Sequence, residues 1–177
     1  ANIEAIRQFA RVNEQNEALL AHPAAPVVLL SKQEEPDQRR VIAPSVAPDN
    51  TKIGVMLPYS PVHHLLLAEV DFPLVMTSGN RSGEPQAITN DAARSQLYDF
   101  ADLWLLHNRP IHNRLDDSVV VAGKHGTQIL RRARGYAPTS LPLPPGFPAA
   151  PALIALGGQL KNTLCLVKER RAVITQH

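Results

Sequence analysis

A loop rich in hydroxyl and amide side chains is the first stretch of the sequence that could do chemistry. Residues 75–86 read Val-Met-Thr-Ser-Gly-Asn-Arg-Ser-Gly-Glu-Pro-Gln. Thr77, Ser78 and Ser82 carry hydroxyls that donate or accept hydrogen bonds, and Asn80 adds an amide. The glycines lack a Cβ atom, so backbone N–H groups can come close to a bound group. These residue types predict either a ligand-binding loop or an ordinary turn between a strand and a helix.

The basic residues of the chain are mostly arginines, with thirteen arginines and five lysines. Arginine presents a planar fork of donors that matches phosphate and carboxylate oxygens. Five arginines gather in one segment: Arg109, Arg114, Arg131, Arg132 and Arg134. The segment predicts an anion site, with a solvated surface of a few ion pairs as the alternative. The net charge of +2 is too small to indicate nucleic acid by itself.

Several common kinds of site are excluded by residue spacing. His63 and His64 are adjacent, so on a helix their side chains point about 100° apart and do not bind one metal ion together. The single cysteine, Cys165, excludes an internal disulfide framework and a cysteine-rich zinc site. The sequence has neither a P-loop nor a Gly-x-Gly-x-x-Gly motif. Ser78 as an acyl-enzyme nucleophile stays open as the alternative chemistry, although it lacks the usual Gly-x-Ser-x-Gly elbow.

Asp116 and Asp117 come directly before Ser118 and leave two interpretations open. Paired carboxylates suit a magnesium ion that accompanies a nucleotide. Aspartate also bonds readily to its own backbone in a turn ahead of a strand.

The elements that must position these residues alternate between strands and helices. Apolar periodicity and capping signals predict helices over 3–10, 13–21, 61–70 and 91–100, and strands over 26–31, 53–57, 72–76 and 103–106. The turn at 123–126 separates strands at 119–122 and 127–130, which together predict a β-hairpin. This order predicts an α/β (α+β) domain with a mixed sheet.

The composition changes after residue 137, which predicts a division into domains of 1–137, 138–151 and 152–177. Six prolines in 138–151 indicate a semi-rigid linker. The last segment carries three short strands, too few for a stable domain, so we expect a second domain that continues past the end of this chain. No apolar run approaches the roughly 20 residues that span a bilayer, and with one cysteine a reducing cytoplasm is the expected location.

Four motifs stand out when they are taken together. They are Thr-Ser-Gly-Asn-Arg-Ser-Gly-Glu-Pro at 77–85, Leu-Pro-Tyr-Ser-Pro-Val-His at 57–63, His-Asn-Arg-Pro at 107–110 with Arg-Leu-Asp-Asp-Ser-Val at 114–119, and Arg-Arg-Ala-Arg-Gly-Tyr-Ala-Pro at 131–138. The set resembles the YrdC-like domain of the HypF family, the carbamoyltransferases of nickel–iron hydrogenase maturation. The tail at 155–164, Ala-Leu-Gly-Gly-Gln-Leu-Lys-Asn-Thr-Leu, is similar to the opening of that family's actin-like carbamoyltransferase domain. The resemblance implies a twisted mixed sheet with flanking helices, truncated at its N-terminal side, followed by the first strands of an actin-like domain.

The resemblance also implies a chemistry. HypF proteins form carbamoyl-adenylate from carbamoyl phosphate and ATP, release pyrophosphate, and transfer the carbamoyl group to the C-terminal cysteine of the protein HypE. By this resemblance Thr77, Ser78 and Asn80 contact the nucleotide or the carbamoyl group, and Ser118 and Arg131 face the same pocket. No catalytic side chain is assigned. Mg²⁺ is expected with the nucleotide, and zinc in another part of the parent protein.

Two departures from the wider family bear on the interpretation. Related threonylcarbamoyl-adenylate synthases carry an arginine, suited to an amino-acid carboxylate, where this chain has Met56, which favours HypF. The family's lysine and arginine motif belongs upstream of this sequence, as do the acylphosphatase and zinc-finger regions of HypF. We therefore expect a fragment that has little or no adenylation activity alone.

Two alternative functions remain open from the sequence. One is threonylcarbamoyl-adenylate synthesis for tRNA modification, which the Asp-Asp-Ser-Val segment and the tail at 155–164 disfavour. The other is a binding module for double-stranded RNA, whose arginine-driven binding would fall steeply with salt.

Overall fold

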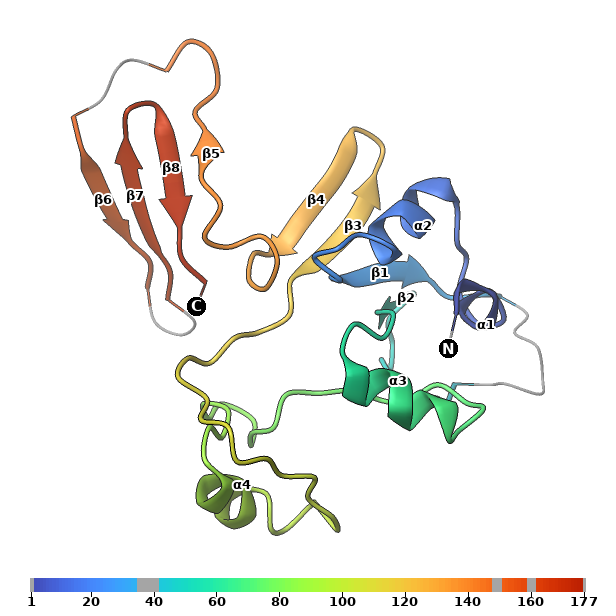
Figure 1. The fold of residues 1–177 in the computed structure, drawn as a ribbon. Coiled ribbons are helices and arrows are strands. Elements are labelled where there is room, and N and C mark those ends of the chain that lie inside the picture. Colours follow the sequence, from blue (N-terminus) through green and yellow to red (C-terminus); the bar gives the residue numbers. More distant parts are fainter. Residues whose placement is uncertain (1, 35–41, 148–150, 159–161, 177) are drawn as a thin grey trace. The chain divides into compact units, whose positions relative to one another are not determined.

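The computed structural model describes residues 2–34, 42–147, 151–158 and 162–176 (Figure 1). The chain divides into two compact units. Unit 1 comprises Ala1–Pro73 and Asp117–His177, and unit 2 comprises Leu74–Asp116. The boundary of unit 2 falls inside the predicted domain 1–137, and the predicted domain limits stay predictions.

Unit 1 contains a mixed four-stranded sheet in the order β2-β1-β3-β4. Its strands are β1 (Val27–Ser31), β2 (Lys52–Val55), β3 (Val119–Gly123) and β4 (Gly126–Arg131). β1 pairs antiparallel with β2 and parallel with β3, and β3 pairs antiparallel with β4. The mixed sheet and the hairpin predicted from the sequence are therefore confirmed.

Two short helices cover this sheet. They are α1 (Ile3–Arg7) and α2 (Glu14–Leu20), and each begins at an asparagine, Asn2 or Asn13, whose side chain accepts a hydrogen bond from a backbone N–H of the first turn. Figure 1 shows α2 lying across β1 and β3, which it contacts. The apolar faces meet in one core formed by Ile6, Phe9, Ala10, Leu20, Val28, Leu30, Ile53 and Val120. The helices predicted at 3–10 and 13–21 are thus present in part, as α1 and α2, and they contribute Ile6 and Leu20 to this core.

Helix α3 (Pro61–Ala68) follows β2 and begins as its sequence predicts. The Ser60 hydroxyl accepts a hydrogen bond from the backbone N–H of His63 at 3.3 Å, and Pro61 occupies the first helical position. Among the described residues, no helix is long and apolar enough to span a membrane.

A second sheet in unit 1 is wholly antiparallel, in the order β5-β8-β7-β6. Its strands are β5 (Leu141–Pro142), β6 (Leu153–Leu156), β7 (Leu164–Lys168) and β8 (Arg171–Ile174). Three of them were predicted, whereas β5 lies within the proline-rich segment 138–151. A proline fits there because β5 is an edge strand, whose unpaired side needs no donor. Residues 148–150 of that segment and 159–161 of the tail motif lie outside the described residues.

Unit 2 has one helix, α4 (Asn90–Gln96), capped by Thr89, and no strand among its described residues. The predicted strands 72–76 and 103–106 were wrong. Val75 is 69% exposed, and Leu103 and Leu105 are 90% and 77% exposed. A short apolar run becomes a strand only where another strand pairs with its backbone, and neither run has such a neighbour in the part of the chain that the structure describes.

Candidate functional site

The five predicted site residues fall on both units. Unit 2 carries Thr77, Ser78 and Asn80, and unit 1 carries Ser118 and Arg131. Within each unit, the surroundings of the side chains show which groups are free to meet a ligand.

Two backbone hydrogen bonds hold the loop of unit 2 in a closed turn. The N–H of Ala87 donates to the carbonyl of Gly79 at 3.0 Å, and the N–H of Glu84 donates to that of Arg81 at 3.0 Å. Gly83 has a φ of +80°, a conformation that favours glycine. The backbone of this loop is therefore ordered by its own bonds.

Two arginines tie the loop to the rest of unit 2. Arg81 donates from Nε to the carbonyl of Gln96 at 3.1 Å and forms an ion pair with Asp99. Arg114 donates from Nε to the carbonyl of Gln86 at 2.8 Å. Sequence reasoning missed the Arg81 contacts, because Asp99 and the end of α4 are distant from Arg81 in the chain.

The tethered loop presents polar groups that the protein itself does not use. Thr77 and Ser78 are exposed, and their hydroxyls have no partner within the described residues. Asn80 donates from Nδ2 to the carbonyl of Arg81 at 2.8 Å, while its Oδ1 is buried and has no partner in that same set. Buried polar atoms are rarely left unpaired. The loop thus offers two free hydroxyls and an unsatisfied amide oxygen on an ordered backbone.

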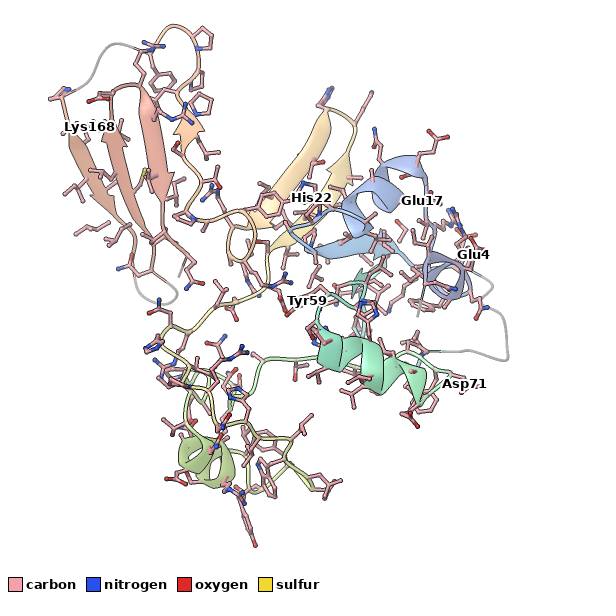
Figure 2. The ribbon with its side chains drawn as sticks, in the orientation of Figure 1. Glu4, Glu17, His22, Tyr59, Asp71 and Lys168 are labelled. Carbon is pink, nitrogen blue, oxygen red and sulfur yellow. The ribbon has the colours of Figure 1, made fainter. Side chains whose placement is uncertain are left out.

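In unit 1, Ser118 and Arg131 lie at one edge of the first sheet, which we call the junction edge. It is formed by the segments 24–26 before β1, 56–60 after β2, 117–118 before β3 and 131–135 at the end of β4. They meet because β1 and β3 run parallel while β2 and β4 run in the opposite direction. Figure 2 labels Tyr59 from the second of these segments, at the start of α3.

Ser118 is completely buried at the junction edge, and its hydroxyl is used inside the protein. The Oγ atom accepts a hydrogen bond from the N–H of Ala133 at 2.8 Å and donates to the carbonyl of Arg134 at 2.9 Å. Its backbone carbonyl accepts from the N–H of Val27 at 2.8 Å. These bonds give Ser118 a structural role, and its contact with a ligand stays a prediction.

Arg131 is half-buried at the end of β4 and has no side-chain partner among the described residues. The register changes beside it, because Val119 pairs with Arg131 and Val120 pairs with Ile129. Such a bulge re-aims the neighbouring side chains. By contrast, Arg132 donates to the carbonyls of Thr139 and Ile174. Arg131 is therefore a cation available to an anionic ligand.

The carboxylates do not form a metal site in the part of the chain that the structure describes. Asp116 accepts a hydrogen bond from the amide of Gln86, and Asp117 forms an ion pair with Arg134 at 2.8 Å. The described residues contain no group of three or more histidine, cysteine, aspartate or glutamate side chains that could hold an ion. These aspartates do not fit a resident magnesium ion, and Mg²⁺ with the nucleotide stays a prediction.

Comparisons with known proteins agree with the sequence resemblance. A family model named Sua5/YciO/YrdC and described as "Telomere recombination" matches residues 1–133. The chain is 48% identical over its whole length to carbamoyltransferase HypF of Rhodobacter capsulatus, of which it covers 23%. It is 43% identical over 99% of its length to HypF of Synechocystis, of which it covers 22%. The chain thus spans less than a quarter of these curated relatives.

Solved structures show the same similarity. The fold matches a crystal structure of full-length HypF in the phosphate- and nucleotide-bound form with a TM-score of 0.87 and 43% sequence identity. The match covers 99% of this chain and 27% of that one. The structure of T. kodakarensis HypF also gives a TM-score of 0.87, at 34% identity, over 99% of this chain and 22% of that one.

Proposed function

This chain belongs to the Sua5/YciO/YrdC family, and from that premise we propose that it is the nucleotide-binding part of a carbamoyltransferase. Relatives named HypF carbamoyltransferase are similar to it along its whole length, which supports this assignment over other members of the family. The observation that carries the proposal is that each unit, taken by itself, has polar groups without a partner in the described residues. They are the hydroxyls of Thr77 and Ser78 and Oδ1 of Asn80 in unit 2, and the guanidinium of Arg131 in unit 1.

The proposed reaction is the formation of carbamoyl-adenylate. Carbamoyl phosphate loses its phosphate to water, which leaves carbamate and inorganic phosphate. An oxygen of the carbamate then attacks the α-phosphorus of ATP, and the bond from that phosphorus to the β-phosphate oxygen breaks, so pyrophosphate leaves. In a later step a cysteine thiolate attacks the carbamoyl carbon and AMP leaves. We propose the C-terminal cysteine of HypE as this acceptor, in the cytoplasm.

The free groups suit this reaction because negative charge accumulates on the oxygens around the α-phosphorus and on the leaving pyrophosphate. Transfer to phosphorus depends on positioned donors and cations more than on covalent catalysis by the protein. Arg131 would offset charge on the phosphate oxygens, and the hydroxyls of Thr77 and Ser78 would donate to oxygens of the nucleotide or carbamate. The Oδ1 atom of Asn80 accepts hydrogen bonds, which suits an amino group of the adenine or the carbamoyl group.

The test is pyrophosphate release by the full-length protein, with ATP and either carbamoyl phosphate or threonine with bicarbonate. We expect release that requires carbamoyl phosphate. Replacing both Thr77 and Ser78 by alanine should lower kcat/KM for ATP about 10²-fold, as loss of positioned donors does. The matched control is Ser95→Ala, since Ser95 lies on α4 and its hydroxyl only donates to the carbonyl of Ala92. Release that requires threonine would show the alternative function, the synthesis of threonylcarbamoyl-adenylate.

A further inference from the structure

The side chain of Arg134 contacts the other three segments of the junction edge. Its Nη1 donates to the carbonyl of Ala24 at 2.9 Å, and its Nη2 donates to that of Ala25 at 2.7 Å. Both Nε and Nη2 donate to Oδ1 of Asp117, at 3.0 and 2.8 Å. The guanidinium carbon lies 3.7 Å from the centre of the Tyr59 ring, at the start of α3 (Figure 2). One residue therefore links the segments before β1, after β2 and before β3.

These contacts leave Arg134 with one N–H donor at most for a phosphate ligand. A guanidinium has five N–H donors, and four hydrogen bonds to Ala24, Ala25 and Asp117 occupy it while its face covers an aromatic ring. Its side chain is only 20% exposed. The side chain of Arg134 therefore makes its contacts within the protein, although it belongs to the same basic segment as Arg131.

The backbone around Arg134 is fixed as firmly as its side chain. The carbonyl of Arg134 and the N–H of Ala133 both bond to the buried hydroxyl of Ser118. Gly135 has a φ of +82°, and a Cβ atom built there would lie 2.4 Å from the Cβ of Ala24. The chain therefore leaves β4 along one path, held against the segments 24–25 and 117–118.

We propose that Arg134 is a positioning residue of the nucleotide site, which acts by fixing the direction in which Arg131 leaves the sheet. The inference rests on the proposed function. Arg131 ends β4 beside the bulge, where it pairs with Val119, and residues 132–135 continue the chain directly from it. A cation binds a phosphate more tightly when its position is fixed before the phosphate arrives, because less conformational entropy is lost on binding. We infer that the contacts of Arg134 fix the position of Arg131 in this way.

A lysine cannot replace Arg134 in this role. An ammonium group is a compact charge without a planar fork. Its three donors sit on one nitrogen atom, so it cannot reproduce the spread of bonds to Ala24, Ala25 and Asp117 together with a planar face on Tyr59. Arg134→Lys keeps the charge of the junction edge and removes the bridge, so it separates a positioning effect from an electrostatic one.

The experiment compares KM for ATP and kcat in pyrophosphate release by the full-length protein. We expect Arg134→Lys to raise KM for ATP about tenfold with a smaller change in kcat. In the double variant Arg131→Gln/Arg134→Lys, the change at Arg134 should raise KM for ATP by less than about twofold over Arg131→Gln alone. A residue that acts through Arg131 has no further effect once Arg131 is removed. Arg11→Lys is the matched control, since Arg11 pairs with the exposed Glu34 away from the junction edge.

Asp117→Asn provides a second variant that keeps the shape of the side chain. It should raise KM for ATP in the same direction and should also be non-additive with Arg131→Gln. An unchanged KM in Arg134→Lys and Asp117→Asn, or full additivity with Arg131→Gln, would overturn the inference and leave the proposed function standing. A wild-type protein that binds no ATP and releases no pyrophosphate would overturn the proposed function, and the inference with it.

Discussion

Neighbouring arginines at the junction edge differ in what their side chains contact. Arg134 is bonded to two carbonyls and a carboxylate, Arg132 bonds to two carbonyls, and Arg131 has no partner among the described residues. The sequence places all three in one basic motif and cannot separate them, because their partners come from residues that are distant in the chain. The absence of a partner among the described residues, rather than charge, is therefore why we propose Arg131 as the ligand-binding arginine.

The first prediction concerns Arg131. Arg131→Gln should raise KM for ATP by about tenfold or more, because a hydrogen bond to a charged group contributes roughly 1.5–3 kcal/mol. The melting temperature should stay nearly unchanged, since no described residue of the protein depends on this side chain. Steady-state kinetics and thermal denaturation measure the two effects. Arg94→Gln, on the exposed face of α4, should change neither.

The second prediction concerns Ser118, which the sequence resemblance places in the ligand pocket. Ser118→Ala should lower the free energy of unfolding by about 1–3 kcal/mol, because it leaves the buried N–H of Ala133 without an acceptor. Urea denaturation measures this loss. A variant that is as stable as the wild type but no longer binds ATP would show that Ser118 contacts the ligand directly.

At the residue level, the sequence indicates the surroundings of a side chain in a local turn better than those of a side chain buried by the tertiary structure. Thr77, Ser78 and Asn80 are polar residues in a turn, so a free hydroxyl or amide follows from their surroundings in the chain. The burial of Ser118 follows from the return of β4 beside β3, which brings Ala133 and Arg134 to its hydroxyl. Such a contact depends on the tertiary structure and has no local sequence signal.

Among the elements, those with a cap or turn signal were predicted correctly. Ser60 and Thr89 begin α3 and α4, and Gly126 has the positive φ of +116° that the hairpin turn requires. The strands predicted at 72–76 and 103–106 were wrong because only apolar composition supported them. An apolar run shows that a segment prefers to be buried, whereas a strand also needs a partner for its backbone.

The third prediction concerns the turn that follows β4. Gly135→Ala should lower the free energy of unfolding by about 1–3 kcal/mol or more, because it combines a left-handed backbone with a Cβ atom too close to Ala24. Chemical denaturation measures the change. Gly158→Ala is the matched control, since a Cβ atom there meets nothing within 4 Å. Equal stability of the two variants would contradict the structure of this turn.

At the scale of the whole molecule, many large apolar side chains of the described residues are exposed. Leu103 and Leu105 of unit 2 and Ile154 and Leu156 of the second sheet are 90%, 77%, 72% and 69% exposed. Large exposed apolar patches commonly mark interaction surfaces. The chain also spans only 23% of its Rhodobacter capsulatus relative, so its activity is best measured in the full-length protein.

The fourth prediction compares residues 1–177 alone with the full-length protein. The chain covers 23% of its Rhodobacter capsulatus relative, and we propose that the complete site needs more of the full-length protein, so residues 1–177 alone should release pyrophosphate at less than about 1% of the full-length rate. A coupled assay with ATP and carbamoyl phosphate measures both at equal concentration. Equal rates would show that residues 1–177 contain the complete site.

The most direct test looks for carbamoyl-adenylate itself. The full-length protein is mixed with ATP and carbamoyl phosphate, the reaction is quenched within one turnover, and mass spectrometry measures the adenylate. We predict carbamoyl-adenylate in the wild type and about 1% of that amount or less in Asn80→Ala, whose truncation removes the unsatisfied amide oxygen of the loop. ATP consumption without any carbamoyl-adenylate in the wild type, or an undiminished amount in Asn80→Ala, would contradict the proposed site.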